Sequence, residues 1–201
     1  MFATILFRLP LLLAPLQLPA PTVKCQLEVL APLTLEDRAL TEFDARIDHY
    51  VALHRRLERS LPPEQLFDDW EEMSEARDGL ADAIREARPH ARPGHILSPG
   101  FREVVTKRVE DTLARADYDL AAVLGAINDE VVPGGPRVKV NRRFPWEHVG
   151  AGMWPALLQV LPALPRELEY RFVDRDLVLV DIHADLVVDI LKEALPKPVR
   201  R

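Results

Sequence analysis

Hydrophobic residues recur at every third or fourth position through most of the first 130 residues, a pattern that predicts a series of amphipathic helices. The first helix is expected over about residues 35–59 and the second over about 63–88. A third helix is expected to begin at Pro99, with Ser98 as its N-cap, because serine is a favoured N-cap and proline a favoured first helical residue. A fourth, or a continuation of the third, covers about residues 120–127. The apolar face of the first helix consists of Leu40, Phe43, Ile47, Tyr50, Val51, His54 and Leu57.

The pattern changes after the Pro-Gly-Gly-Pro sequence at residues 133–136. Val138 and Val140 alternate with polar residues and indicate a short strand, and residues 154–160 indicate one or two helical turns. Residues 168–172 then alternate between apolar and polar, and residues 177–182 are almost continuously apolar. Two such runs separated by a short charged turn predict a β-hairpin.

The last apolar run, residues 186–195, is expected to form a short helix with Asp185 as its N-cap and Pro196 at its end. An isolated hairpin is marginally stable in water, so the hairpin should dock on the helices. The sequence therefore predicts a mainly helical α+β fold: three or four antiparallel helices with a C-terminal β-hairpin packed on them. The chain has 201 residues, enough for the single domain that we expect over residues 33–196.

Residues 1–21 are apolar and are interrupted by Arg8 and several prolines. They are too broken for a stable membrane-spanning helix and fit a signal peptide better, although Pro21 is unfavourable for cleavage after Ala20. We therefore expect an exported protein of the periplasm or cell envelope, with membrane contact only through this segment if it is not cleaved. Cys25 is the only cysteine, which excludes an intramolecular disulfide.

The net charge of −6 argues against nucleic acid as a partner, because binding the phosphate backbone requires clustered positive charge. One basic cluster does occur beside Phe144 and Trp146, where it resembles a patch for an anionic ligand. A solvated or salt-bridged surface is the alternative that we favour. The patch comprises Arg137, Lys139, Arg142 and Arg143.

Asp181, His183 and Asp185 are the residues that most resemble a metal-ligand set. In an extended strand, residues two apart share a face, so the three side chains could converge on one cation. The alternative, which we favour, is local structure: Asp181 ends a strand, His183 lies in a turn and Asp185 caps a helix. The Asp-x-His motif also begins calcineurin-like metallophosphoesterases, but the 16 residues that follow Asp185 hold no further histidine.

The remaining histidines carry weaker signals. His49 and His54 lie five apart on the first helix, whereas helical metal pairs prefer a spacing of four. His54 is therefore interpreted as a core histidine and His49 as a surface residue. His90 and His95 flank a Pro- and Gly-containing loop and could bind zinc with Asp82 or Glu86, although a solvated loop is the simpler interpretation. We expect no cofactor.

Four segments resemble a family of uncharacterised exported bacterial proteins. They are residues 43–58 (FDARIDHYVALHRRLE), 79–97 (GLADAIREARPHARPGHIL), 161–179 (LPALPRELEYRFVDRDLVL) and 181–191 (DIHADLVVDIL). The chain departs from the family pattern at Asp174, where glycine is usual, and at Asp185, where asparagine is usual. The resemblance implies export and a helical domain with a hairpin, and it implies no reaction.

The sequence contains no Gly-x-Ser-x-Gly elbow, no Walker loop and no dinucleotide-binding glycine motif. The leading hypothesis is thus a non-enzymatic binding or interaction module with an unidentified envelope or secreted partner. The alternative is a small metal-dependent hydrolase that uses Asp181, His183 and Asp185.

Overall fold

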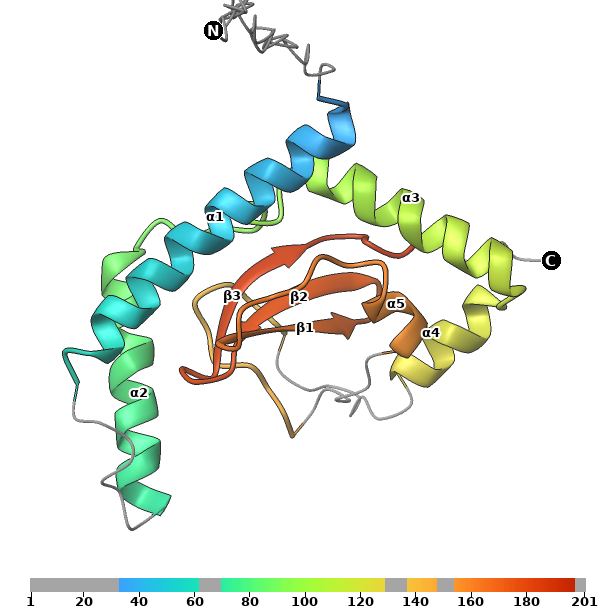
Figure 1. The fold of residues 1–201 in the computed structure, drawn as a ribbon. Coiled ribbons are helices and arrows are strands. Elements are labelled where there is room, and N and C mark those ends of the chain that lie inside the picture. Colours follow the sequence, from blue (N-terminus) through green and yellow to red (C-terminus); the bar gives the residue numbers. More distant parts are fainter. Residues whose placement is uncertain (1–32, 62–69, 129–136, 148–153, 198–201) are drawn as a thin grey trace, which may run out of the picture. The chain divides into compact units, whose positions relative to one another are not determined.

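The computed structural model describes residues 33–61, 70–128, 137–147 and 154–197. These residues form five helices and one three-stranded antiparallel sheet with strand order β1-β2-β3 (Figure 1). The prediction of a mainly helical α+β fold with a C-terminal hairpin is confirmed. The elements are α1 (Leu35–Glu58), α2 (Trp70–Ala87), α3 (Pro99–Ala116), α4 (Leu120–Asn128), α5 (Pro155–Leu158), β1 (Leu168–Val173), β2 (Asp176–Asp181) and β3 (Leu186–Leu191).

Local signals set the ends of the long helices. Thr34 caps α1 by accepting a hydrogen bond from the backbone of Asp37, whose side chain in turn accepts from the backbone of Thr34. Ser98 caps α3, and Asp117 ends it in the left-handed conformation with φ 52°. The part of the second predicted helix that precedes Trp70 lies outside the described residues.

Two predictions in the C-terminal half are wrong. Residues 186–191 form the third strand rather than a final helix, and Asp185 (φ 49°) lies in the turn before it. The run contains the β-branched residues Val187, Val188 and Ile190, which pack well in a pleated sheet. The expected strand at Val138 and Val140 also does not form. Instead, a single antiparallel bridge joins Arg143 to Leu186.

Strands β2 and β3 are buried on both faces, whereas β1 is buried at every second residue. On one face, α1, α3 and the sheet share the main hydrophobic core, in which the rings of Phe43 and Phe101 stack 4.3 Å apart. On the other face, Phe144 packs on Val178, Val180, Val187 and Ile190. A strand covered on both faces has no solvated face, which explains why β2 and β3 are mostly apolar.

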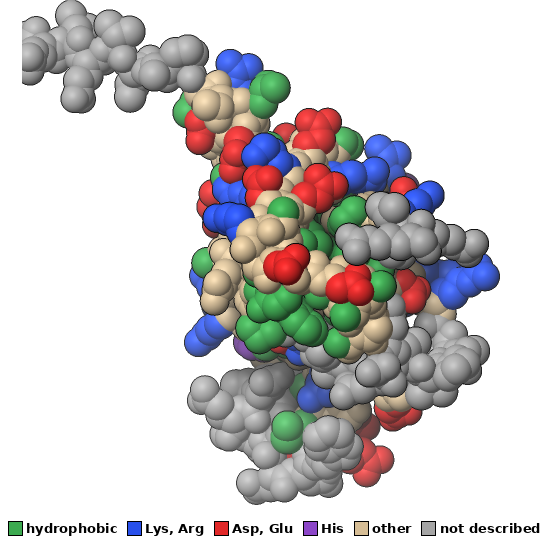
Figure 2. All heavy atoms as spheres, turned by 90° about the vertical axis from the view of Figure 1, so that its right-hand side faces the viewer, with side chains coloured by type: hydrophobic (Ala, Val, Ile, Leu, Met, Phe, Trp, Pro, Cys, Tyr) green, Lys and Arg blue, Asp and Glu red, His purple; other side chains and the backbone are tan. Residues whose placement is uncertain are grey.

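Where α3, α4 and α5 lie, hydrophobic side chains gather on the surface (Figure 2). Tyr118 and Leu158 are among the exposed hydrophobic residues of this region. No helix in the described ranges combines the length and apolar character needed to cross a membrane.

A buried aspartate on β3 fastens the loop between α2 and α3 to the sheet. The Asp189 carboxylate accepts hydrogen bonds from the backbone N–H groups of Gly94, Ile96 and Leu97, at 2.8, 2.5 and 2.8 Å, and also from Ile190. A loop of this composition would otherwise leave buried N–H groups unsatisfied. The aspartate therefore determines how the loop lies against the core.

Candidate metal centre

The C-terminal half of α1 turns three polar side chains toward the sheet. Tyr50, His54 and Glu58 follow one another at intervals of four residues and so lie on one face of the helix. Tyr50 and His54 are buried, whereas the Glu58 side chain is about one-third exposed at 34%. The apolar face of the helix thus ends in a polar stripe that must find partners on the sheet.

Asp181, the last residue of β2, supplies those partners. Its Oδ2 accepts a hydrogen bond from the Tyr50 hydroxyl at 2.6 Å and lies 2.6 Å from His54 Nδ1. Its Oδ1 accepts from the backbone N–H groups of His183 and Ala184 at 3.1 and 2.9 Å. One buried carboxylate therefore orients His54 and shapes the turn that carries His183.

The second ring nitrogen of His54, Nε2, is buried and has no hydrogen-bond partner. It lies 3.6 Å from Glu58 Oε1, and that oxygen lies 3.0 Å from His183 Nδ1. The rings of His54 and His183 are 5.4 Å apart. We call these residues the His54–Glu58–His183 cluster. Ligand atoms from all three lie within 4.8 Å of one another.

These separations suit a metal ion of the zinc class. A tetrahedral ion with ligands at about 2.0–2.1 Å holds those ligands roughly 3.4 Å apart. The observed separations of 3.0 and 3.6 Å bracket that value. Metal-bound histidines normally donate their other N–H to a carboxylate, and Asp181 stands in that position behind His54. The donor types and the two separations measured from Glu58 Oε1 therefore fit such an ion.

The electrostatics of the cluster favour a cation. Burial lowers the pKa of His54, but the hydrogen bond and charge of Asp181, together with Glu58 and Glu167, outweigh burial and raise that pKa. Burial and the charge of Asp181 raise the pKa of Tyr50 well above its ordinary value, so Tyr50 remains a hydrogen-bond donor. Positive charge at His54 Nε2 is therefore stabilised, whether a proton or a metal carries it.

An ion pair borders the cluster. Arg55 Nε donates to Oε1 of the buried Glu167 at 2.7 Å, while Glu167 Oε2 has no hydrogen-bond partner. Burial raises the pKa of Glu167, but Arg55 outweighs burial and lowers it. The Arg55 side chain is half exposed. A half-exposed cation thus lies beside the negative charges that surround His54.

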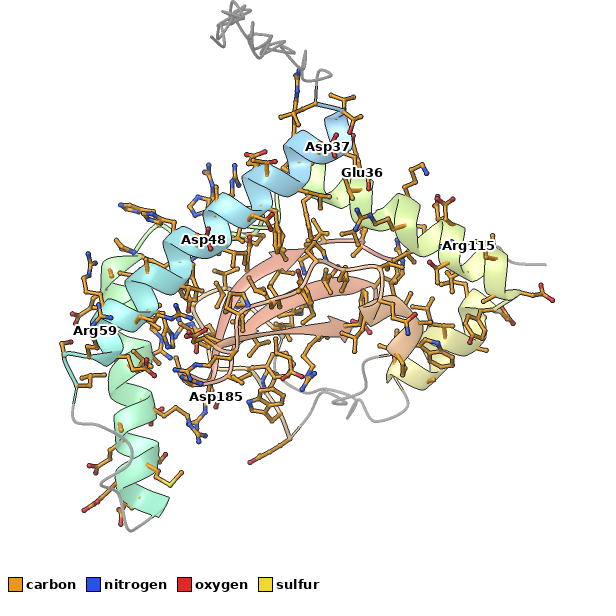
Figure 3. The ribbon with its side chains drawn as sticks, in the orientation of Figure 1. Glu36, Asp37, Asp48, Arg59, Arg115 and Asp185 are labelled. Carbon is orange, nitrogen blue, oxygen red and sulfur yellow. The ribbon has the colours of Figure 1, made fainter. Side chains whose placement is uncertain are left out.

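The structure separates the three residues of the Asp-x-His-x-Asp motif. Asp181 supports His54 from behind, His183 joins the cluster, and Asp185 accepts hydrogen bonds from Arg143 Nε and Trp146 Nε1. Figure 3 labels Asp185 at this end of the sheet. The alternation expected of a strand fails here because residues 182–185 form a turn.

The other predicted residues lie elsewhere. His49, His90 and His95 line one cavity of about 600 Å³ with Arg46 and Arg88, but they belong to no group of three potential metal ligands among the described residues. The basic residues of the patch line a second cavity, described below. The predicted core position of His54 is confirmed, because its side chain is fully buried, whereas Glu58 was not among the predicted ligands. The available signal was the spacing of four between these two residues, in place of the spacing of five between His49 and His54.

Comparison of the chain with protein-family models, with curated proteins and with solved structures finds no match.

Proposed function

We propose that this protein is an exported metal-binding module that holds a divalent ion of the zinc class at His54, Glu58 and His183. One observation carries the proposal: His54 Nε2 is buried without a partner, and Asp181 orients it toward Glu58 and His183. A buried polar atom without a partner is unfavourable, and metal coordination removes that penalty. Two histidines and a carboxylate suit zinc better than calcium or magnesium, which prefer oxygen ligands alone.

Export is supported by the apolar residues 1–21 and by the family resemblance of the sequence. A divalent ion in a protein can stabilise the fold, bind a partner or activate water, and the last two roles bear on function. Partner binding corresponds to the leading hypothesis from the sequence. Water activation corresponds to the alternative hypothesis of a hydrolase, with His54, Glu58 and His183 as ligands in place of Asp181, His183 and Asp185.

The binding experiment uses cobalt(II) as a spectroscopic substitute for zinc. Tetrahedral coordination by nitrogen and oxygen gives visible absorption bands that are much stronger, and at longer wavelength, than those of the octahedral aqua ion. We expect one cobalt per chain in the wild type and loss of the bands in His183→Ala. The matched control is His49→Ala, an exposed histidine on the same helix, which should retain them.

Asp181→Asn tests the orienting role of the carboxylate. Loss of the partner behind a metal-bound histidine typically weakens metal binding by about 10- to 100-fold. Bands of equal strength in the wild type and in His183→Ala, or no cobalt bound by a folded wild type, would contradict the proposal.

A second candidate function, metal-dependent hydrolysis, is favoured by the exposure of the cluster. The side chains of Glu58 and His183 are 34% and 27% exposed, so one side of the site faces solvent. Catalytic zinc sites use three protein ligands and keep the fourth position for water, whose pKa the metal lowers to about 7. The test is hydrolysis of activated esters and phosphate esters by the zinc-loaded protein. Activity equal to that of His183→Ala would eliminate this candidate.

A further inference from the structure

A second site lies on the opposite face of the sheet from α1. A cavity of about 1000 Å³ is bordered by Arg77 of α2 and by residues 137–147, which we call the basic segment. Four of its lining residues come from the predicted patch: Arg137, Lys139, Arg142 and Arg143. The acidic residues among the described lining are Glu147 and Asp185.

The basic segment is fastened to the sheet. Asn141 N–H donates to the carbonyl of Val187 at 2.9 Å, and Val187 N–H donates to the carbonyl of Arg142 at the same distance. Phe144 is buried against β2 and β3. The segment is therefore held in one conformation, and a ligand that binds it does not have to order a free loop.

Apolar and charged residues alternate along the basic segment, so its charged side chains point away from the sheet. Val138 and Val140 pack against the sheet, while Arg137 and Lys139 are exposed. Arg142, after the turn at Asn141, is exposed as well. The valines thus act as anchors, and the cations between them are presented to the cavity.

The described lining of the cavity holds five basic residues and two acidic ones, Glu147 and Asp185. Asp185 already accepts hydrogen bonds from Arg143 and Trp146. None of the residues that the structure describes forms a hydrogen bond or ion pair with the side chains of Arg137, Lys139 or Arg142. The interpretation as a salt-bridged surface therefore explains Arg143 alone. The other three cations, Arg137, Lys139 and Arg142, face one cavity in a chain of net charge −6.

We propose that this cavity binds a ligand carrying two or more phosphate groups, either a free oligophosphate or the phosphate headgroup of a lipid. Arginine and lysine are the main phosphate-binding side chains, and exposed cations that share a cavity attract such a ligand more strongly than one cation does. The volume exceeds what one phosphate fills, and Phe144, Pro145 and Trp146 supply an apolar wall for the remainder of the ligand.

The first experiment titrates inorganic tripolyphosphate into the protein by calorimetry, without added metal. The double variant Lys139→Ala/Arg142→Ala should bind at least about tenfold more weakly, because each lost cation removes a charge-assisted hydrogen bond. The matched control is Arg38→Ala/Arg102→Ala, which removes two exposed cations outside the cavity and should bind like the wild type.

A chelating anion could take metal from the other site, so His183→Ala is titrated in parallel. Unchanged binding by His183→Ala assigns the anion to the cavity, and loss of binding in that variant overturns the proposal. Cobalt binding by the His54–Glu58–His183 cluster is measured in its own experiment. A failure of metal binding at the cluster is therefore distinguishable from a failure of anion binding at the cavity.

The second experiment measures sedimentation with vesicles of phosphatidylcholine, with or without cardiolipin, whose headgroup carries two phosphate groups. Binding that requires cardiolipin and is lost in Lys139→Ala/Arg142→Ala identifies a lipid headgroup. Binding of tripolyphosphate alone identifies a free oligophosphate. If neither anion binds, or if the double variant binds both as the wild type does, the proposal is refuted.

Discussion

Replacement of Asp189 by asparagine should destabilise the fold through one loop. Asp189 Oδ1 accepts from Gly94 and Ile190, and Oδ2 accepts from Ile96 and Leu97. Asparagine is nearly isosteric but offers one acceptor oxygen, so its amide group faces two N–H donors that it cannot satisfy. The variant therefore isolates the effect of the lost acceptor from any change of volume.

The magnitude follows from the two bonds that are lost. Hydrogen bonds to charged groups contribute about 1.5–3 kcal/mol each, and relief of the buried charge offsets part of the loss. We expect Asp189→Asn to lower the free energy of unfolding by about 3 kcal/mol. With a urea m-value of about 2 kcal/mol/M, the midpoint should fall by roughly 1.5 M.

Urea denaturation measures this shift, and Asp48→Asn provides the matched control. Asp48 is exposed on α1 (Figure 3), and its substitution should change stability by less than about 0.5 kcal/mol. Hydrogen exchange should also show faster opening at the amides of Ile96 and Leu97. If Asp189→Asn unfolds at the same urea concentration as Asp48→Asn, the account of the loop is refuted.

Three further outcomes are expected. Phe101→Ala should lower stability by about 3–5 kcal/mol in urea denaturation, because the buried ring stacks on Phe43, and an effect below 1 kcal/mol would contradict this packing. Hydrogen bonds from Thr34 lower the pKa of Asp37. The ionised carboxylate therefore stabilises the fold at pH values above 3.8, the pKa of the unfolded state, and this stabilisation is lost as the pH falls through the lower pKa of the folded state. The stability difference between the wild type and Asp37→Asn should therefore vanish in acid, and a constant difference at all pH values would argue against the capping box. Zinc at 100 times its dissociation constant should stabilise the wild type by about 2.7 kcal/mol, with no such thermal shift in His183→Ala or after chelation.

The helices were predictable because their signals are local. The apolar spacing of α1 and the cap at Ser98 depend on residues within a few positions of one another. The third strand was not predictable in the same way. Its apolar run fits a buried strand as well as a buried helix, and the choice depends on the basic segment that covers its second face.

The candidate site could be predicted only in part for the same reason. His183 is conspicuous in the Asp-x-His-x-Asp motif, but its partners come from α1, more than 120 residues earlier in the chain. The motif suggests three converging ligands, whereas a tight turn separates the side chains of Asp181 and Asp185. Long-range partners of this kind leave no periodic signal. The spacing of four between His54 and Glu58 was the one local trace of the site.

Asp181 couples the stability of the fold to the geometry of the cluster. One of its oxygens holds the turn that carries His183, and the other holds Tyr50 and His54. Loss of Asp181 would therefore disturb both histidines together, so Asp181→Asn cannot by itself separate folding from metal binding. Tyr50→Phe removes one hydrogen bond to the carboxylate and leaves every ligand in place, whereas His183→Ala removes a partly exposed ligand and leaves the carboxylate in place. If the cluster binds a metal, Tyr50→Phe should reduce stability more than His183→Ala when metal is absent, and His183→Ala should reduce metal affinity more than Tyr50→Phe. A site with a purely structural role would show the first difference without the second.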